Sequence, residues 1–202
     1  DLRRFTEAEE AYKEALETRK RLADKSPDAY QPDVAMTQNN LGILYIQTDR
    51  TEEGIDILKD VLNKRELLQD LGAGGFSVLG TGCERLGNRK EAAQCYLSSS
   101  ASYFHLFTRG VDCSEAVLGN LVKTIELDEG EIIGDAATML IALGKILGKD
   151  DLKDLKIPGK KSLSKRGEAL KEALDGKKVD FDPEPKDEVD MMVCEMIKLL
   201  SF

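Results

Sequence analysis

The sequence predicts an all-α protein built from stacked pairs of antiparallel helices, and three observations support this prediction. Apolar residues return every three or four positions over most of the 202 residues, which is the period of a helix. Only five prolines occur, while good helix formers such as Ala, Leu, Glu and Lys are abundant. A glycine-containing pattern also recurs at a constant distance, which is typical of a repeat protein. We therefore expect a helical stack that ends in a capping helix.

The first predicted helix covers residues 2–23, where charged residues surround a single apolar face. Residues 26–33 follow with two prolines, so we expect a loop there. The apolar face of the helix consists of Phe5, Ala8, Tyr12, Ala15 and Leu16.

The central segment, residues 33–68, reads as two amphipathic helices joined by a polar turn at residues 47–50. Gly42 in the first helix is expected to face Gly54 in the second, because residues without a side chain let two helices approach closely. A branched side chain at either position would prevent this approach. The positions that define the pair are Leu41, Gly42, Tyr45, Gly54 and Leu58.

The same pattern returns over residues 75–100. Gly42 and Gly80 are 38 residues apart, and so are Gly54 and Ala92. Two independent pairs that share one period are a specific indication of a repeat, because chance similarity would rarely keep both helices in register. The equivalent positions here are Leu79, Gly80, Ala92 and Tyr96.

On these residues the chain resembles the tetratricopeptide repeat family, in the long-period form of kinesin light chains and many prokaryotic repeat proteins. The resemblance covers residues 1–107, with the first repeat reduced to its second helix, and implies a right-handed α-α superhelix. We expect residues 108–202 to form a divergent helical region that ends in a capping helix at about residues 186–201.

Glycines are expected to end three helices of the divergent region, at Gly110, Gly148 and Gly176. A basic stretch over residues 160–178 is expected to face solvent, an acidic partner or the acidic run at residues 180–190. The final helix carries an apolar stripe at spacings of three and four, formed by Val189, Met192, Val193, Met196, Ile197 and Leu200.

Composition limits the classes of partner. A formal net charge of −9 argues against nonspecific binding to a nucleic-acid backbone. No signal peptide is visible, and no apolar stretch reaches the roughly 20 residues that span a bilayer. The four cysteines show no metal-type spacing, so we expect reduced thiols and a cytoplasmic location.

No catalytic residue, cofactor or metal site is predicted. His105 is the single histidine and has no carboxylate or cysteine at ligand spacing. The glycines of residues 72–82 lack the Lys-Ser/Thr end of a phosphate loop, which favours a linker and close helix packing. The acidic run over residues 180–190 lacks the glycine and terminal glutamate of a calcium loop.

The resemblance implies that first helices line a concave groove that receives an extended peptide or a helix. On a helical wheel, Ile43 lies opposite Leu41 and Tyr45, so it belongs to the groove side. Asn39 and Asn40 either bind a ligand backbone or are solvated, and the sequence leaves both readings open. The predicted groove residues are Asn39, Asn40, Ile43, Gln47, Ser77, Thr81 and Arg85.

The function predicted from these observations is a noncatalytic scaffold for protein–protein interaction. The alternative is a ligand-sensing or regulatory module with a small-molecule or nucleic-acid site in the divergent C-terminal half. A homodimer could form through the exposed face around Phe5, Ala8 and Tyr12.

Overall fold

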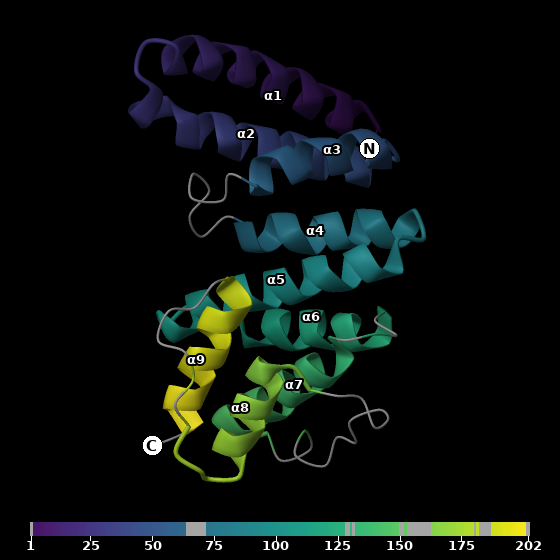
Figure 1. The fold of residues 1–202 in the computed structure, drawn as a ribbon. Coiled ribbons are helices and arrows are strands. Elements are labelled where there is room, and N and C mark those ends of the chain that lie inside the picture. Colours follow the sequence, from purple (N-terminus) through teal and green to yellow (C-terminus); the bar gives the residue numbers. More distant parts are fainter. Residues whose placement is uncertain are drawn as a thin grey trace. The chain divides into compact units, whose positions relative to one another are not determined.

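The computed structural model describes residues 2–63, 72–127, 130, 132–149, 152, 163–179, 181 and 187–200. Over these residues the regular elements are α-helices, without any strand, so the all-α prediction is confirmed (Figure 1). The chain separates into two compact units, Asp1–Asn88 and Arg89–Phe202, called here the N-terminal and C-terminal units. The division expected after residue 107 was drawn from sequence resemblance and stays a prediction.

The helices in the described residues of the N-terminal unit pack in sequence order. Helix α1 packs against α2, α2 pairs with α3, and α4 contacts both α2 and α3. The first helix has the predicted limits, and the turn predicted at residues 47–50 separates α2 from α3. The helices are α1 (Leu2–Ala23), α2 (Pro27–Gln47), α3 (Thr51–Leu62) and α4 (Gly72–Arg85).

The prediction of a loop at residues 26–33 is wrong, because α2 already begins at Pro27. Proline is tolerated at the first helical position, where its missing N–H would have no partner inside the helix. The carbonyl of Ser26 accepts hydrogen bonds from the N–H groups of Ala29 and Tyr30, which starts the helix. Pro32 lies only one turn further on and removes a single donor. The connection between α1 and α2 is therefore short.

Gly42 and Gly54 lie where α2 and α3 touch, as predicted. A Cβ atom at Gly54 would lie 2.7 Å from the carbonyl oxygen of Gly42 and 2.6 Å from Cγ1 of Ile46. A Cβ atom at Gly42 would lie 2.8 Å from Cγ of Leu58, a side chain that is fully buried. The two helix backbones are thus in contact through both glycines.

Helix α4 uses glycines in the same way against α2 and α3. A Cβ atom at Gly82 would lie 3.0 Å from Cδ1 of Ile46 and 3.1 Å from Cγ1 of Ile55. At Gly75 a Cβ atom would overlap Oδ1 of Asn39. The close helix packing expected from this glycine cluster is therefore present within the N-terminal unit. The linker expected at the same glycines is wrong, because α4 already begins at Gly72.

The turn after helix α2 contains a residue in the left-handed backbone conformation, Asp49, with φ of 63°. The N–H of Arg50 donates to the carbonyl of Tyr45 over 2.9 Å, which satisfies an end carbonyl. Helix α4 ends in the same geometry, but there the left-handed residue is Gly87. A glycine avoids the contact between Cβ and the carbonyl that disfavours this conformation in other residues.

Asp49→Gly is expected to raise the free energy of unfolding by about 0.5 kcal/mol, since relief of the left-handed conformation exceeds the entropy cost of glycine. Urea denaturation followed by circular dichroism measures the change. The matched variant Gly87→Asp should lower stability, because it places a side chain in the same conformation. A loss of stability in Asp49→Gly would contradict the argument.

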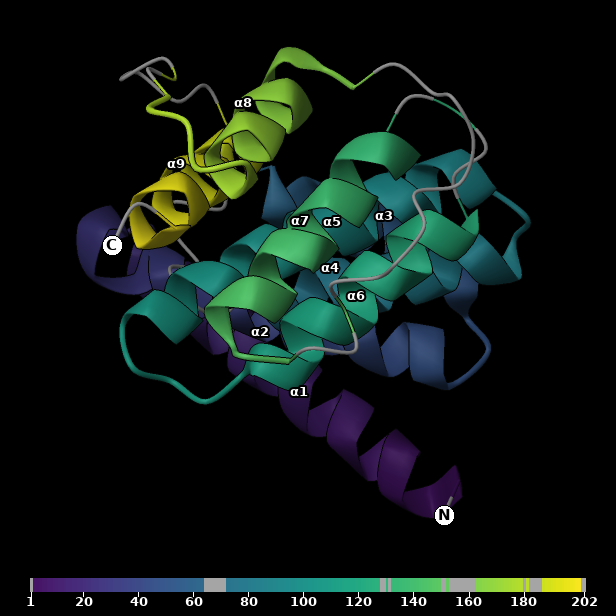
Figure 2. The ribbon, with the colours of Figure 1, turned by 90° about the horizontal axis from the view of Figure 1, so that it is seen from below.

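In the described residues of the C-terminal unit, every helix contributes to one continuous apolar core. Helix α5 packs against α6, α6 against α7, and α7 against α8, while α9 contacts α5, α7 and α8. Figure 2 shows α8 and α9 side by side. Phe104 and Leu121 are fully buried at the centre. The helices are α5 (Arg89–Thr108), α6 (Ser114–Leu127), α7 (Ile133–Ile146), α8 (Lys165–Leu174) and α9 (Glu188–Leu200).

Helix α9 buries the apolar stripe that was predicted for the last helix. Its buried residues are Val189, Met192, Val193, Met196 and Ile197, and Leu200 is partly buried against the same core. The glycines expected to end helices are also found in place, each with a positive φ, at Gly110, Gly148 and Gly176. The capping role proposed for this helix stays a prediction.

A buried carboxylate joins α7 to the start of α8. Asp135, in the first turn of α7, is 4% exposed. Its Oδ1 accepts a hydrogen bond of 3.0 Å from the backbone N–H of Ser164, and its Oδ2 accepts one from the Ser164 hydroxyl. Gly167 lies against the same carboxylate, where a Cβ atom would overlap Oδ1. Asp135 therefore supplies the negative charge that a helix N-terminus favours.

The basic stretch is partly paired with the acidic run that follows it. Arg166 lies 3.4 Å from Oδ1 of Asp187 and 3.3 Å from Oδ1 of Asp190. These ion pairs connect α8 to the start of α9. They agree with the expectation that the basic stretch faces the acidic run. Residues 160 and 161 of the basic stretch, and 180, 182 and 184 of the acidic run, lie outside the described residues.

Candidate functional site

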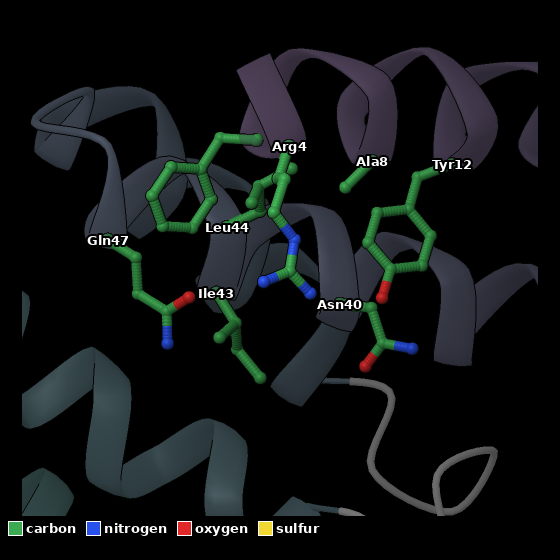
Figure 3. A pocket seen from close by; sticks show the side chains of 8 residues that line it. Arg4, Ala8, Tyr12, Asn40, Ile43, Leu44 and Gln47 are labelled. Atoms are coloured by element: carbon green, nitrogen blue, oxygen red, sulfur yellow. The ribbon is translucent and has the colours of Figure 1, made fainter. Parts of the chain in front are cut away.

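A pocket of about 560 Å³ lies between α1 and α2. Each helix contributes one face, because the lining positions recur at spacings of three and four. Figure 3 shows the α1 side chains reaching toward α2 across this space. The lining residues are Arg4, Phe5, Ala8, Tyr12, Asn40, Ile43, Leu44 and Gln47.

The pocket combines apolar packing with polar groups from both helices. Leu44 is buried and packs with Ala8 and Tyr12 in a small apolar cluster. Ile43 is half-buried, and Phe5 is 36% exposed at the N-terminal end of α1. Such a mixture of apolar area and a few polar groups is typical of a site that binds an organic ligand or a peptide.

Several polar side chains of the pocket, the hydroxyl of Tyr12 among them, have no partner among the described residues. Arg4, Asn40 and Gln47 make neither a hydrogen bond nor an ion pair in this part of the chain. Neighbouring cations of α1 are paired, since Arg3 lies 3.1 Å from Glu7 and Lys13 lies 2.7 Å from Glu9. The pocket therefore presents hydrogen-bonding capacity that the protein itself does not use.

A polar cluster around Glu9 connects α1 to the turn between α2 and α3. The Glu9 carboxylate lies 2.7 Å from both Nζ of Lys13 and Nη1 of Arg50, and accepts a hydrogen bond of 3.0 Å from the Tyr45 hydroxyl. Arg50 also stacks 3.7 Å above the Tyr45 ring and binds Glu53. These contacts fix α1 against α2, the helix that forms the other wall of the pocket.

Because of this cluster, the stability of the folded protein depends on pH. Hydrogen bonds from Lys13, and then from Arg50, lower the pKa of Glu9 from 4.5 to about 2. Since the pKa is lowered on folding, the stabilisation is complete above pH 4.5 and disappears as the pH falls toward 2. Glu9→Gln should lower the free energy of unfolding at pH 7 by about 1 kcal/mol.

Thermal unfolding between pH 7 and pH 2 measures this dependence. The difference in midpoint between the parent protein and Glu9→Gln should shrink as the pH falls below 4.5. Glu17→Gln is the control, because Glu17 is an exposed residue of the same helix and pairs with exposed Lys20 at 3.4 Å. A difference for Glu9→Gln that stays constant down to pH 2 would rule out the pairing.

The structure brings together three of the seven predicted groove residues. Asn40, Ile43 and Gln47 line the pocket. Asn39 instead is 4% exposed and lies against Gly75 of α4, and its Oδ1 has no hydrogen-bond partner among the described residues. The side chain of Asn39 thus takes part in helix packing and is not accessible to a ligand.

The predicted groove residues of α4 do not line the pocket. Ser77 and Thr81 are half-buried, and the Thr81 hydroxyl donates to the carbonyl of Ser77 over 3.1 Å. Arg85 is exposed, and its guanidinium donates to the carbonyl of Ile46 near the end of α2. Sequence reasoning missed Arg4 as a site residue, although its spacing of four from Ala8 places it on the same helix face.

A second pocket, of about 870 Å³, lies around α8 in the C-terminal unit. Its charged residues are of both signs, and Lys177 lies 3.6 Å from Glu172. This mixture gives no preference for a nucleic-acid backbone, and the alternative of a small-molecule site in this half of the chain stays a prediction. The lining residues are Leu163, Lys165, Glu168, Ala169, Lys171, Glu172, Asp175, Lys177, Lys178, Val179 and Phe181.

Other chemical features are sparse in the described part of the chain. No group of three potential metal ligands occurs there, and His105 is exposed on α5. None of the four cysteines, at positions 83, 95, 113 and 194, forms a disulfide bond in the described structure. None of the helices described combines the length and the apolar character that a membrane span needs.

The sequence model of the tetratricopeptide repeat family matches residues 1–28 and 34–68. The first range covers α1, and the second covers most of α2 and all of α3, so both walls of the pocket fall within the matched repeats. The repeat expected at residues 75–100 and the kinesin-light-chain subtype stay predictions. Comparison with curated proteins and with solved structures gives no match.

Proposed function

We propose that this chain, whose residues 1–28 and 34–68 match the tetratricopeptide repeat family, is a noncatalytic scaffold, because such repeats are generally protein–protein interaction modules without catalytic activity. In this proposal the pocket between α1 and α2 binds an extended peptide or a helix of a partner protein. The observation that supports it is the pairing of an apolar surface with polar side chains that have no partner in the described structure.

The side chains of the pocket suit a polypeptide. An amide side chain both donates and accepts, so Asn40 and Gln47 can bond to the N–H and C=O groups of a peptide backbone. Ile43 and Phe5 supply apolar area for a partner side chain. The volume of about 560 Å³ falls within the range common for ligand sites. We propose that the groove continues over α4 through Ser77, Thr81 and Arg85.

Selection from a phage-displayed library of random 12-residue peptides, followed by fluorescence titration of the selected peptides, tests the proposal. Asn40→Ala combined with Gln47→Ala should weaken binding about tenfold, and Ile43→Asp should weaken it more, because it buries a charge against the peptide. Glu10→Ala is the control, since Glu10 is an exposed residue of α1 outside the pocket. Equal affinity for all variants would show that the peptides bind elsewhere.

Self-association through α1 is the competing use of the same surface. Phe5, Ala8 and Tyr12 line the pocket, so a second copy of the chain that covered them would exclude a peptide. Sedimentation velocity with and without a selected peptide separates the two uses. A dimer that dissociates when the peptide is added would place both partners on one site. The proposed location of the scaffold is the cytoplasm.

A further inference from the structure

We propose that the pocket between α1 and α2 selects an internal peptide segment in which an acidic side chain stands next to an apolar one. This inference rests on the proposed function and adds to it the chemistry of the partner. It is carried by the charge of the pocket, by the positions of its amides, and by the pairing of the surrounding ions.

Arg4 sets the charge preference. It is the only charged residue among those that line the pocket. The acidic residues of α1 nearest to it are already engaged, since Glu7 pairs with Arg3, and Glu9 pairs with Lys13 and Arg50. Arg4 itself has no partner in the described residues. A guanidinium binds a carboxylate through two parallel hydrogen bonds, so an acidic side chain is its best complement.

The two amides set the length of the segment. Asn40 and Gln47 are seven residues apart on α2, which corresponds to about 10 Å along a helix axis. An extended peptide covers this distance in about three residues. Figure 3 shows Arg4 reaching toward α2 in the space between Gln47 and Asn40. A peptide held by both amides therefore presents its middle residue to Arg4 and continues beyond the pocket at both ends.

The apolar neighbour follows from the alternation of an extended chain. Successive side chains point to opposite sides, so a residue next to the acidic one faces away from Arg4 and toward α2. The apolar side chain of α2 that is partly exposed at this place is Ile43. An apolar side chain is the complement of that surface. The segment is thus acidic toward α1 and apolar toward α2.

The net charge of −9 opposes an acidic ligand at long range. This repulsion is screened beyond about 8 Å at physiological salt, whereas a direct pair with Arg4 is screened much less. The preference for an acidic side chain therefore acts at short range. The difference in affinity between acidic and neutral peptides should be largest at an ionic strength near 0.15 M.

The test uses the full chain and the peptides selected from the 12-residue library, synthesised with acetylated and amidated ends. Peptides selected by the parent protein should be enriched in Asp or Glu beside an apolar residue. The Arg4→Glu variant should bind these peptides at least tenfold more weakly than the parent protein. A peptide in which the acidic residue is replaced by Lys should bind the Arg4→Glu variant well again. The matched control is Arg21→Glu, an exposed arginine of the same helix outside the pocket, which should stay within about twofold.

The outcomes separate this inference from the proposed function. If the selected peptides no longer bind the Ile43→Asp variant but are not enriched in acidic residues, the inference is overturned and the proposed peptide-binding pocket is retained. Peptides that bind Ile43→Asp as well as the parent, or a library that yields no binder, would overturn both. Binding that requires a free C-terminal carboxylate would overturn the assignment of an internal segment. Arg4→Glu should keep the helix content, because an acidic residue favours the N-terminal turn of α1.

Discussion

Gly54→Leu is expected to lower the free energy of unfolding by about 3 kcal/mol, at the upper end of the usual cost of overpacking. The reason is that the first atom of the new side chain meets backbone atoms, which cannot rotate away. A Cβ atom at Gly54 would lie 2.7 Å from the carbonyl oxygen of Gly42 and 2.9 Å from the backbone nitrogen of Ile46. Helices α2 and α3 must then separate. Urea denaturation followed by circular dichroism measures the loss.

Two other glycines serve as controls for this prediction. Gly42→Ala should cost less than Gly54→Ala, because its closest contact is the movable side chain of Leu58 at 2.8 Å. Gly119→Ala should instead raise stability by about 0.5 to 1 kcal/mol, since no atom lies within 4 Å of a Cβ atom there and alanine favours the helix. If Gly54→Leu and Gly119→Ala had equal effects, close approach of α2 and α3 would be excluded.

Asp135→Ala is expected to lower the free energy of unfolding by about 3 kcal/mol, because it removes two charge-assisted hydrogen bonds from the start of α8. The backbone N–H of Ser164, now 3.0 Å from the carboxylate, loses its acceptor. Asp135→Asn is the milder variant, since the amide oxygen can still accept one of the two bonds. Thermal and urea unfolding of both variants give the comparison. Equal stability of Asp135→Ala and the parent would contradict the capping role.

Gly167 provides an independent check on the same contact. Gly167→Ala should destabilise the parent protein, because the new methyl group would overlap the Asp135 carboxylate. In the Asp135→Ala background that space is free, so the second substitution should cost at least about 1 kcal/mol less. The double-mutant cycle isolates this coupling from any general effect of alanine on α8. Strictly additive losses would mean that the two residues do not share the space.

The parts of the fold that the sequence predicts well are those set by short-range geometry. The facing pair Gly42 and Gly54 follows from spacing within one helix hairpin and from the size of the side chains. The limits of α1 follow from its continuous amphipathic pattern. The buried stripe of α9 follows from the same period. None of these requires knowledge of where a distant helix lies.

The parts that could not be predicted depend on packing between elements. A helical wheel places Asn39 on the free side of α2, but α4 packs over that side and buries it against Gly75. A rotation of about 100° per residue leaves the adjacent Asn40 in the pocket. The sequence likewise shows two adjacent arginines, yet only the structure shows that Arg3 pairs with Glu7 while Arg4 lines the pocket.

The contact between Asn39 and Gly75 has a consequence for the evolution of this chain. Because a methyl group at position 75 would occupy the place of the Asn39 oxygen, alanine there is compatible only with a smaller residue at position 39. The two positions should therefore change together among homologues, with serine, alanine or glycine at 39 wherever 75 has gained a side chain. Position 40, one residue away, is free of this constraint and can diverge with the choice of partner.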